Sequence, residues 1–526
     1  MWRSLGRLVL VSLVLCASGA AADIRFDRNQ TRTLTQTDAG GANESGDEFG
    51  AALAAGDLDG DGYDDLVVGA PSDGGAGTVF VFPGGPTGFA AGLHRFESDA
   101  ERGGVPSPEV AGDFFGAVVA VGNFDADPQR ELVVGAPGRA SNAGAVFVFQ
   151  GAAGSGVLGA TGVWFDSSQL GCGAATAGDG FGTTLAVGDF NGDGYDDLVI
   201  GAPGASSNAG KICVVPGSFS GLVDGTGAAY FEDTNGYVPS AVEPGDRFGA
   251  ALAVGHFTND AYADLVIGAP GEAPGADPAG GSVAVWFGKN ATSIGDFFAS
   301  GISFIESNAP SQVVEAGDAF GQALATAAAS GSPDRLYIGA PGDPGGAGSG
   351  LVFPFYFTFG TTSTQYGLPL SQTYLCCVGP AEANENGDGY GGALAAGDVD
   401  GNGYDELLVG VPSEDGGTGM VMLYSDSSLA GFALARSYRP DDVLPTDGVS
   451  HAGSYFGEAL ASGDFHGDGR REFAIGAPVE QIGGQSSGAV YVAPEPNGSG
   501  LGLAAAVACA LLSAGSRRRR SSSSSR

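Results

Sequence analysis

The chain has 526 residues, of which 95 are glycine and 43% are hydrophobic, and it lacks a Gly-X-Y period, so collagen and simple disorder are both excluded. The formal charge of −38 argues against binding to nucleic acid or anionic membranes, because phosphate would be repelled. So many carboxylates on one compact body also repel one another, and bound divalent cations would relieve that repulsion.

Residues 1–22 have the pattern of a secretory signal peptide. Arg3 and Arg7 make the start basic, Leu8–Leu15 is an apolar run, and Ala20-Ala21-Ala22 is a small-residue cleavage site. We therefore expect export and cleavage near Ala22.

A two-part pattern occurs seven times in the body of the chain, residues 23–493. Phe-Gly or Tyr-Gly pairs begin at Phe49, Phe115, Phe181, Phe248, Phe320, Tyr390 and Phe456, so successive pairs lie 66 to 72 residues apart. About twenty residues after each pair comes a Gly-Ala-Pro or Gly-Val-Pro triplet, which begins at Gly69, Gly135, Gly201, Gly268, Gly339, Gly410 and Gly476. Internal repetition of this kind indicates one repeat structure rather than several unrelated domains.

Each repeat has the pattern of four short strands. The first repeat predicts strands at Leu53–Gly56, Leu66–Gly69 and Thr78–Phe82, and a segment such as Val163–Phe165 predicts the fourth. Glycine, asparagine and aspartate clusters separate the strands, and Pro71 ends the second one because proline cannot donate to a ladder. Seven such units arranged radially bury both faces of each sheet. The sequence therefore predicts an all-β, seven-bladed β-propeller of four-stranded antiparallel blades.

These repeats resemble the FG-GAP repeats of the propeller found at the head of integrin α chains. The resemblance covers about residues 23–493. Only 66 residues separate the second and third Phe-Gly pairs, so no ligand-binding domain is inserted there, and only a short tail follows the seventh repeat. The sequence thus indicates the propeller used alone, without the integrin leg domains, and heterodimer formation is not implied.

An acidic loop between the first two strands of the repeat carries the chemistry. Asp57, Asp59 and Asp61 place oxygens at positions 1, 3 and 5, and Gly62 at position 6 permits a sharp turn, as in the first half of an EF-hand loop. The Tyr63 backbone carbonyl at position 7 and Asp65 at position 9 complete the expected set. Full matches recur in the third and sixth repeats: Asp189, Asn191, Asp193, Tyr195 and Asp197; Asp398, Asp400, Asn402, Tyr404 and Glu406.

The other four loops depart from this pattern. The second repeat keeps Asn123, Asp125, Asp127 and Glu131 but has Pro128 at position 6, and the seventh keeps Asp464, Asp468 and Glu472 but has His466 at position 3. The fourth keeps only Asp260 and Asp264, and the fifth, which starts at Ala328, has lost the carboxylates and one residue. We expect no metal in the fourth and fifth.

Calcium is the cofactor that the resemblance to integrin α implies for these loops. Ca²⁺ is a hard cation that takes six to eight oxygen ligands, which suits carboxylates at alternating positions. The alternative is that the loops are only polar Asx turns between strands.

The two ends of the repeat region are expected to meet in one blade. Asp23–Asp27 resembles the fourth-strand segment Val163–Asp166 although it precedes the first Phe-Gly pair, and the seventh repeat stops after Ala489–Val492. We therefore expect an N-terminal strand to complete the last blade.

The resemblance also places a ligand on the face opposite the acidic loops, at segments such as Ser72–Ala76 and Gly271–Gly281 and before each Phe-Gly pair.

Of the four cysteines in the body, two are candidates for a disulfide. Cys172 and Cys213 flank one repeat, whereas the adjacent Cys376 and Cys377 receive no assignment.

Residues 494–526 form the tail. Pro494-Glu495-Pro496 precedes a short apolar stretch, Leu501–Ala514, and the basic run Arg517–Arg520, and the stretch is too short to span a bilayer comfortably. This tail resembles the PEP-CTERM sorting signal, which implies a bacterial source, an exosortase-type processing enzyme and a place at the cell envelope or surface. A weak tail anchor and a disordered end are the alternatives.

The function that we expect is a secreted or envelope-associated adhesion or ligand-binding module for an extracellular protein or glycan. The alternative is an accessory propeller of a hydrolase or lyase acting on lipid or polysaccharide, since FG-GAP propellers also accompany catalytic domains, as in the phospholipase that cleaves GPI anchors. The repeats leave no room for such a domain, so we expect no enzymatic activity. A purely structural envelope protein is the third alternative.

Overall fold

The computed structural model describes most of the repeat region. The described residues are 31–89, 94–97, 110–153, 158–223, 225–232, 242–258, 260–273, 279–291, 297–305, 315–329, 332–343, 350–357, 364–367, 369–371, 385, 387–425, 433–443 and 451–493. The signal peptide 1–22, the segment Asp23–Asp27, the pair Cys376-Cys377 and the tail 494–526 lie outside them.

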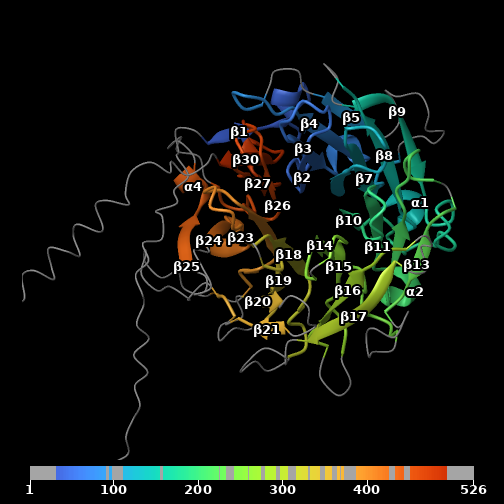
Figure 1. The fold of residues 1–526 in the computed structure, drawn as a ribbon. Helices are drawn as coiled ribbons and strands as arrows, with labels where there is room; N and C mark the ends of the chain where they lie inside the picture. The colour runs from blue at the N-terminus through green and yellow to red at the C-terminus, as the bar shows by residue number, and fades with distance from the viewer. Residues whose placement is uncertain are drawn as a thin grey trace, which may run out of the picture.

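Seven four-stranded antiparallel sheets form a ring, as expected for a seven-bladed propeller (Figure 1). The first three blades are β2 (Ala52–Gly56), β3 (Asp65–Ala70), β4 (Thr78–Phe82) and β5 (His94–Glu97); β6 (Val118–Gly122), β7 (Glu131–Ala136), β8 (Ala145–Gly151) and β9 (Leu158–Phe165); β10 (Thr184–Gly188), β11 (Asp197–Ala202), β12 (Lys211–Val215) and β13 (Ala228–Tyr230).

The next three blades repeat this order. They are β14 (Ala251–Gly255), β15 (Asp264–Ala269), β16 (Ser282–Gly288) and β17 (Phe298–Ile305); β18 (Ala323–Ala327), β19 (Arg335–Ala340), β20 (Leu351–Phe357) and β21 (Thr364–Tyr366); β22 (Ala393–Gly397), β23 (Glu406–Val411), β24 (Met420–Ser425) and β25 (Ala433–Tyr438). The first strand of each blade contacts the first strands of both neighbouring blades, so the ring is closed.

The seventh blade joins the two ends of the described chain. Its strands are β26 (Leu460–Gly463), β27 (Glu472–Ala477), β30 (Ala489–Ala493) and β1 (Arg32–Leu34). β1 pairs antiparallel with β30, and Leu34 lies opposite Val490 (Figure 1). The prediction that an N-terminal strand completes the last blade is therefore confirmed, and the pairing strand lies at Arg32–Leu34, C-terminal to Asp23–Asp27.

Short elements connect the strands. They are η1 (Gln36–Ala39), η2 (Asp73–Gly75), α1 (Arg139–Asn142), α2 (Ala205–Asn208), α3 (Glu414–Gly417), α4 (Pro440–Val443) and the hairpin of β28 (Gln481–Ile482) and β29 (Gln485–Ser486). No helix in the described ranges has the length and apolar character needed to cross a membrane.

The core is divided into seven hydrophobic clusters, one between each pair of neighbouring blades. Side chains alternate along a strand, so Leu66 and Val68 of β3 pack toward the seventh blade whereas Val67 packs toward the second. Phe115 of the second Phe-Gly pair packs against the first blade. Each sheet thus buries both faces, which explains why the strands are apolar at consecutive positions.

One disulfide adds to this packing. Cys172, after β9, is bonded to Cys213 of β12, with their Cα atoms 5.7 Å apart, in the cluster between the second and third blades. The pairing suggested by the sequence is therefore present.

The strand directions divide the ring into two faces. The acidic loops follow the first strand of each blade and lie at one end, which we call the loop face. The Phe-Gly pairs, the segments after Gly-Ala-Pro and the connections from one blade to the next lie at the other end of the strands, which we call the opposite face.

Candidate metal centres and ligand pocket

In the first acidic loop, three carboxylates converge. One oxygen from each of Asp57, Asp59 and Asp61 lies within 4.8 Å of the other two. Asp57 holds the loop closed, because its Oδ1 accepts from the Gly60 amide at 2.7 Å and its Oδ2 from the Gly62 amide at 3.0 Å. Gly60 and Gly62 have φ of 75° and 92°, which glycine adopts without strain. The loop therefore gathers oxygens through turns that glycine permits.

The third and sixth loops adopt the same turns. Gly192 and Gly194 have φ of 74° and 91°, and Gly401 and Gly403 have φ of 73° and 84°. The backbone amides at position 7 donate to the position 5 side chain in all three loops: Tyr63 to Asp61, Tyr195 to Asp193, and Tyr404 to Asn402. The predicted matches thus share one backbone conformation.

The residue at position 9 has two different placements. Asp65 is buried, and its oxygens accept from the Leu58 and Gly84 amides, each at 2.9 Å, so Asp65 lies outside the three-carboxylate cluster. Glu406 is one methylene longer; its Oε2 accepts from the Val399 amide at 3.1 Å, and one of its oxygens also lies within 4.8 Å of oxygens of Asp398 and Asp400. Side-chain length therefore decides whether position 9 anchors the loop only or also reaches the candidate site.

Asp197 anchors the third loop as Asp65 does the first. It accepts from the Phe190 and Gly217 amides at 3.1 and 3.0 Å. The Asn191 side-chain nitrogen lies 3.1 Å from Asp193 Oδ2 and 3.4 Å from Asp197 Oδ1. A cation at this position would require Asn191 to turn its oxygen toward the carboxylates instead.

The second loop gathers carboxylates by another route. Asp125, Asp127 and Glu131 place one oxygen each within 4.8 Å of one another, although position 6 is Pro128. With its side-chain amide turned to donate, Gln150 lies 3.2 Å from Glu131 Oε1 and 3.1 Å from Asp125 Oδ2. This amide satisfies two oxygens that a cation would otherwise take. Asn123, by contrast, donates its backbone amide to Asp196 of the next blade at 2.9 Å.

In the seventh and fourth loops, histidine replaces an oxygen donor. His466 Nδ1 lies 2.8 Å from Glu472 Oε1, while Asp464 accepts from the amides of Asp468 and Gly469. In the fourth loop, Asp260 is exposed and Asp264 accepts from two backbone amides, as Asp65 does. Neither loop forms a three-carboxylate cluster among the described residues.

Burial makes these acids harder to ionise. It raises the pKa of Asp65 to about 7 and that of Asp197 to about 8. Burial, followed by the charges of Asp125 and Asp127, raises the pKa of Glu131 to about 8. The pKa of Glu406 also rises to about 8, because of burial and then Asp400. A bound cation would favour the ionised forms.

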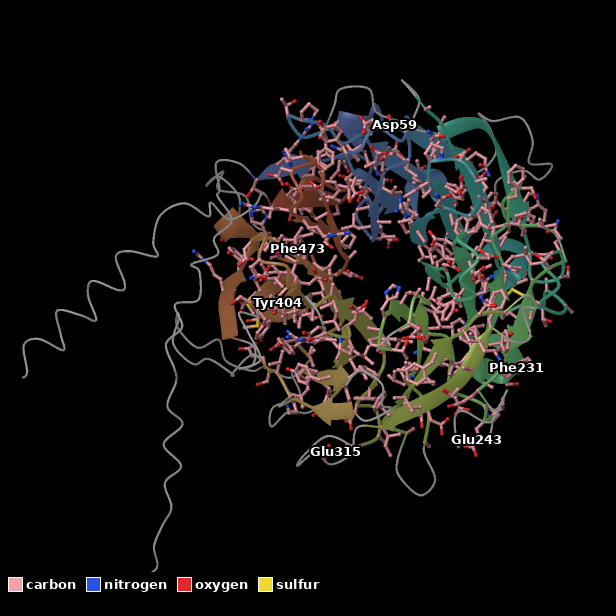
Figure 2. All side chains as sticks on the ribbon, in the orientation of Figure 1. Asp59, Phe231, Glu243, Glu315, Tyr404 and Phe473 are labelled. Atoms are coloured by element: carbon pink, nitrogen blue, oxygen red, sulfur yellow. A yellow bond between two sulfur atoms is a disulfide. The ribbon has the colours of Figure 1, made fainter. Side chains whose placement is uncertain are left out.

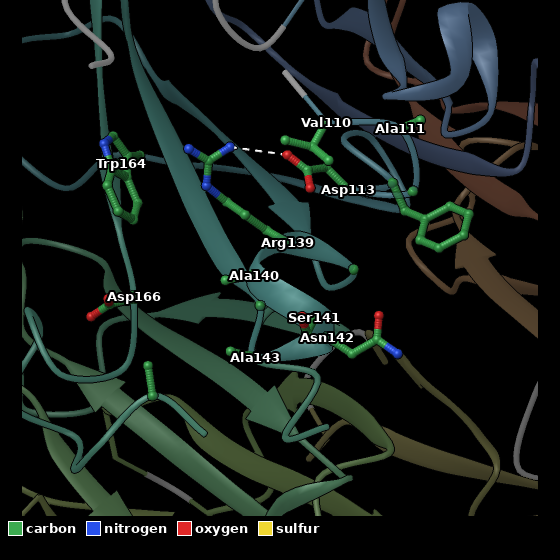
Figure 3. Close-up of a pocket in the computed structure, with 15 residues that line it drawn as sticks. Val110, Ala111, Asp113, Arg139, Ala140, Ser141, Asn142, Ala143, Trp164 and Asp166 are labelled. Atoms are coloured by element: carbon green, nitrogen blue, oxygen red, sulfur yellow. Dashed lines mark hydrogen bonds and ion pairs between the residues drawn. The ribbon is translucent and has the colours of Figure 1, made fainter. Parts of the chain in front are cut away.

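The opposite face carries a pocket of about 700 Å³ at the second blade (Figure 3). Its lining includes Trp164 of β9, and the Arg139 guanidinium carbon lies 4.9 Å from the Trp164 ring centre. Arg139 also donates to Asp113 Oδ2 at 3.1 Å, so its charge is neutralised and its position fixed. Phe114, 42% exposed, also lines the pocket and has φ of 55°, a conformation that bulky residues rarely adopt.

A known family of repeats matches several of these blades. The model of the FG-GAP repeat matches five segments, 49–82, 181–215, 248–286, 390–424 and 456–493. The chain is therefore a β-propeller with FG-GAP repeats.

Among curated proteins, the rat phosphatidylinositol-glycan-specific phospholipase D is 33% identical to this propeller over 186 residues. The Xenopus laevis integrin alpha-4 is 31% identical over 176 residues, and the Drosophila melanogaster integrin alpha-PS5 is 36% identical over 169. These matches cover 33%, 33% and 31% of this chain but only 20%, 16% and 16% of the relatives. The chain thus matches a fifth or less of their length.

Among solved structures, the Dos1 propeller aligns with a TM-score of 0.37 at 10% identity, over 81% of this chain and 74% of that chain. The fold of the FG-GAP propeller rests on its strand pairing rather than on this likeness.

Sequence reasoning missed the residue at position 8 of the acidic loops. The Asp64 amide donates to the Asp464 carbonyl of the seventh blade at 3.0 Å, and Asp64 Oδ2 accepts from the Asp464 amide at 2.9 Å. Asp405 makes the same two-way link to Ala328. Asp334 makes the same two-way link to His256, although the loop of Asp334 lacks the carboxylates at positions 1, 3 and 5. An aspartate therefore remains at position 8 even where the other loop acids are lost, and this pattern in the sequence could have indicated that position 8 joins neighbouring loops.

Proposed function

We propose that this chain is a secreted, calcium-binding FG-GAP propeller that acts as an adhesion or ligand-binding module. The observation that carries the proposal is the pocket on the opposite face, where the aromatic rings of Trp164 and Phe114 lie near polar groups. A volume of about 700 Å³ falls in the range of small-molecule and side-chain sites. The ligand that we propose is an extracellular glycan or a loop of an extracellular protein.

The chemistry of the pocket supports this ligand class. The Arg139 charge is already paired with Asp113, so the site does not select for an anion. Trp164 offers a ring face against which sugars and apolar side chains pack, and Asp166 and Asn142 offer hydrogen-bonding groups. Tyr455, 38% exposed with φ of 55°, occupies in the seventh blade the position that Phe114 has in the second.

The binding test compares two faces of the ring. The wild-type mature protein is applied to glycan and protein arrays, and each positive partner is then tested with Trp164→Ala and Phe114→Ala. We expect at least about a fivefold loss of affinity, because truncating an aromatic anchor costs about 1 kcal/mol or more. Phe219→Ala removes an equally large side chain, 78% exposed, from the connection after β12 at the loop face, and should leave binding unchanged. Equal binding by all three variants would refute the pocket as the ligand site.

We propose Ca²⁺ for the acidic loops because their donors are hard oxygens at alternating positions. The first, third and sixth loops should bind most tightly. The second follows, because Gln150 competes for its carboxylates, and the seventh, because His466 occupies Glu472. The fourth and fifth loops should bind none. A bound ion would neutralise the clustered carboxylates and hold the loops of neighbouring blades in place.

Isothermal titration of the mature protein tests the loops. Asp61→Ala and Asp193→Ala should each remove one bound Ca²⁺, whereas Asp260→Ala in the fourth loop should remove none. At about 100-fold excess over Kd, each independent site should add roughly 2.7 kcal/mol to the free energy of unfolding. Fewer than three ions bound by the wild type, or loss of an ion in Asp260→Ala, would contradict the assignment.

Catalysis is the second candidate function, because some relatives are phospholipases by name. We propose binding without turnover, since glycoside hydrolysis requires two carboxyl groups and Asp113, one of the two in the pocket lining, is paired with Arg139. Incubation with lipid and polysaccharide panels decides between the two, and product formation that survives purification to homogeneity would favour a hydrolase or lyase.

We also propose export through the signal peptide 1–22 and sorting to a bacterial cell envelope through the tail 494–526, with processing by an exosortase-type enzyme. The Cys172–Cys213 disulfide supports an oxidising compartment. Mass spectrometry of the protein purified from its native envelope tests both cleavages.

A further inference from the structure

Three buried carboxylates meet on the opposite face, at the junction between the third and fourth blades. Glu232 follows β13, Asp246 precedes the Phe248-Gly249 pair, and Glu272 follows the Gly-Ala-Pro triplet of the fourth blade. One oxygen of each lies within 4.8 Å of the other two, and the residues are only 1%, 3% and 1% exposed. Figure 2 labels Phe231, which directly precedes Glu232, and Glu243, which lies three residues before Asp246. This group is distinct from the acidic loops, which lie at the other end of the strands.

Glu232 has no positively charged partner among the described residues. Neither of its carboxylate oxygens accepts a hydrogen bond of normal geometry, and no lysine, arginine or histidine within the described ranges pairs with it. Asp246 Oδ2 accepts from the Glu243 amide at 2.6 Å, which fixes that side chain in the group. A buried carboxylate in this setting must either take up a proton or hold a cation.

Burial and neighbouring charge both oppose ionisation of the group. Burial, followed by the charge of Glu272, raises the pKa of Glu232 to about 9, and the nearby Ser282 hydroxyl only partly opposes this shift. Burial and the charge of Glu272 also raise the pKa of Asp246 to about 6.

The neighbouring junctions show how the fold balances the same position elsewhere. Between the first and second blades, Asp113 takes the place of Asp246 and pairs with Arg139, which takes the place of Glu272. The guanidinium and carboxylate are 3.1 Å apart. A positive charge supplied by the chain thus neutralises this junction.

Between the second and third blades, a lysine has the same role. Lys211 Nζ lies 3.3 Å from Asp179 Oδ2 and 3.2 Å from Ser167 Oγ, and all three residues are buried. Strand register equates Lys211 with Ser282, because each pairs with the alanine of Gly-Ala-Pro. Ser167 and Glu232 are equivalent in the same way. In each blade, the second residue of the third strand pairs with a fourth-strand residue, Phe165 or Tyr230, and Ser167 or Glu232 follows two residues later. At the junction between the third and fourth blades, the Ser282 hydroxyl therefore lies where the preceding junction has the Lys211 ammonium. The Glu232 carboxylate lies where that junction has the Ser167 hydroxyl.

We propose that Glu232, Asp246 and Glu272 bind a divalent cation, Ca²⁺, which links the third and fourth blades. The donors are carboxylate oxygens alone, a set that favours hard cations over zinc. Oxygens separated by up to 4.8 Å fit around an ion that is 2.3–2.6 Å from each ligand. The cation supplies at this junction the positive charge that Arg139 and Lys211 supply at the other two.

The experiment counts ions and does not depend on the acidic loops. Metal-free mature protein is equilibrated with Ca²⁺, and bound ions per chain are measured for the wild type, for the double variant Glu232→Gln with Glu272→Gln, and for Ser282→Lys. Both variants should bind one ion fewer than the wild type. Ser282→Lys keeps all three carboxylates and introduces the ammonium found at the second junction, so its loss of an ion would reflect displacement rather than unfolding. An unchanged count in both would overturn the proposal and indicate protonated carboxylates.

Two controls separate this site from the others. Asp113→Asn with Arg139→Gln removes a charge pair from an equivalent junction and should leave the ion count unchanged. Asp61→Ala should remove a different ion, so that combining it with Ser282→Lys removes two. If the loops bind no Ca²⁺ at all, the wild type should still bind one ion that Ser282→Lys removes. The same titration with Mg²⁺ should show weaker binding, because that smaller ion requires octahedral geometry and gives up water reluctantly; tighter binding of Mg²⁺ would overturn the choice of Ca²⁺.

Discussion

At the scale of single residues, one close contact explains the glycine of each Gly-Ala-Pro or Gly-Val-Pro triplet. A Cβ atom added at Gly69 would lie 2.0 Å from the carbonyl oxygen of Gly116, in the next Phe-Gly pair. At the glycines of the other six triplets, an added Cβ atom would lie 2.1 to 2.4 Å from the corresponding carbonyl oxygen. The two halves of the repeat are therefore the two sides of one contact between blades.

Gly69→Ala should lower the free energy of unfolding by about 3 kcal/mol, because the added methyl group meets backbone that cannot move without shifting a blade. Gly85→Ala is the matched control, since its nearest neighbour would be the Gly88 carbonyl at 3.4 Å, an ordinary contact. Urea titration of both variants measures the difference. Equal stability would mean that the blades separate more easily than this contact implies.

At the scale of elements, the ring depends on a three-residue strand. β1 pairs with β30, and Leu34 is fully buried in the cluster between the seventh and first blades, where Phe49 and Val490 also lie. The strand adds both backbone hydrogen bonds and apolar contact at the point where the ends of the described chain meet.

Leu34→Ala should cost about 3 kcal/mol of stability, because it removes buried methyl groups and leaves a cavity at the closure. Thr33→Ala, on the same strand but only partly buried, should cost less than about 1 kcal/mol. Thermal unfolding measures both changes. If Leu34→Ala melts with the wild type, the closing strand does not contribute to the stability of the ring.

Across the ring, buried acids of the acidic loops link stability to pH. The pKa values of Asp65, Asp197, Glu131 and Glu406 rise to about 7 or 8 in the folded state because of burial. In an unfolded chain such groups titrate near pH 4. Between about pH 4 and pH 8 the folded state therefore binds more protons than the unfolded state. In the metal-free protein, the contribution of these groups to the free energy of unfolding is complete below about pH 4 and is lost as the pH rises to about 8.

Calcium should reverse this loss, because it neutralises the ionised carboxylates in the folded state alone. The increase in melting temperature on adding Ca²⁺ to metal-free protein should be small at pH 5 and should grow by several degrees at pH 8. Melting curves at the two pH values, with and without Ca²⁺, measure it, and Na⁺ at equal ionic strength is the control. An increase that is the same at both pH values would show that the ion does not compete with these protons.

The number of blades, the strands and the acidic loops could all be predicted from the amino-acid sequence. These features are local: the short apolar runs, the glycine at loop position 6 and the two short motifs each lie within about twenty residues of one repeat. The strand observed at Thr78–Phe82 has the predicted bounds for the same reason. The sequence also indicated the closing strand, although not that Arg32–Leu34 would be the segment that pairs.

Which side chains meet between blades could not be predicted in this way, because it depends on the folded ring. Asp65 and Glu406 occupy the same loop position, but their different lengths place one on backbone amides and the other in a carboxylate cluster. Glu232 and Glu272 come from consecutive repeats, and no local pattern pairs them. Their meeting is fixed by strand register and by the curvature that closes the ring, because those two features set which loop ends of neighbouring blades share the same buried space.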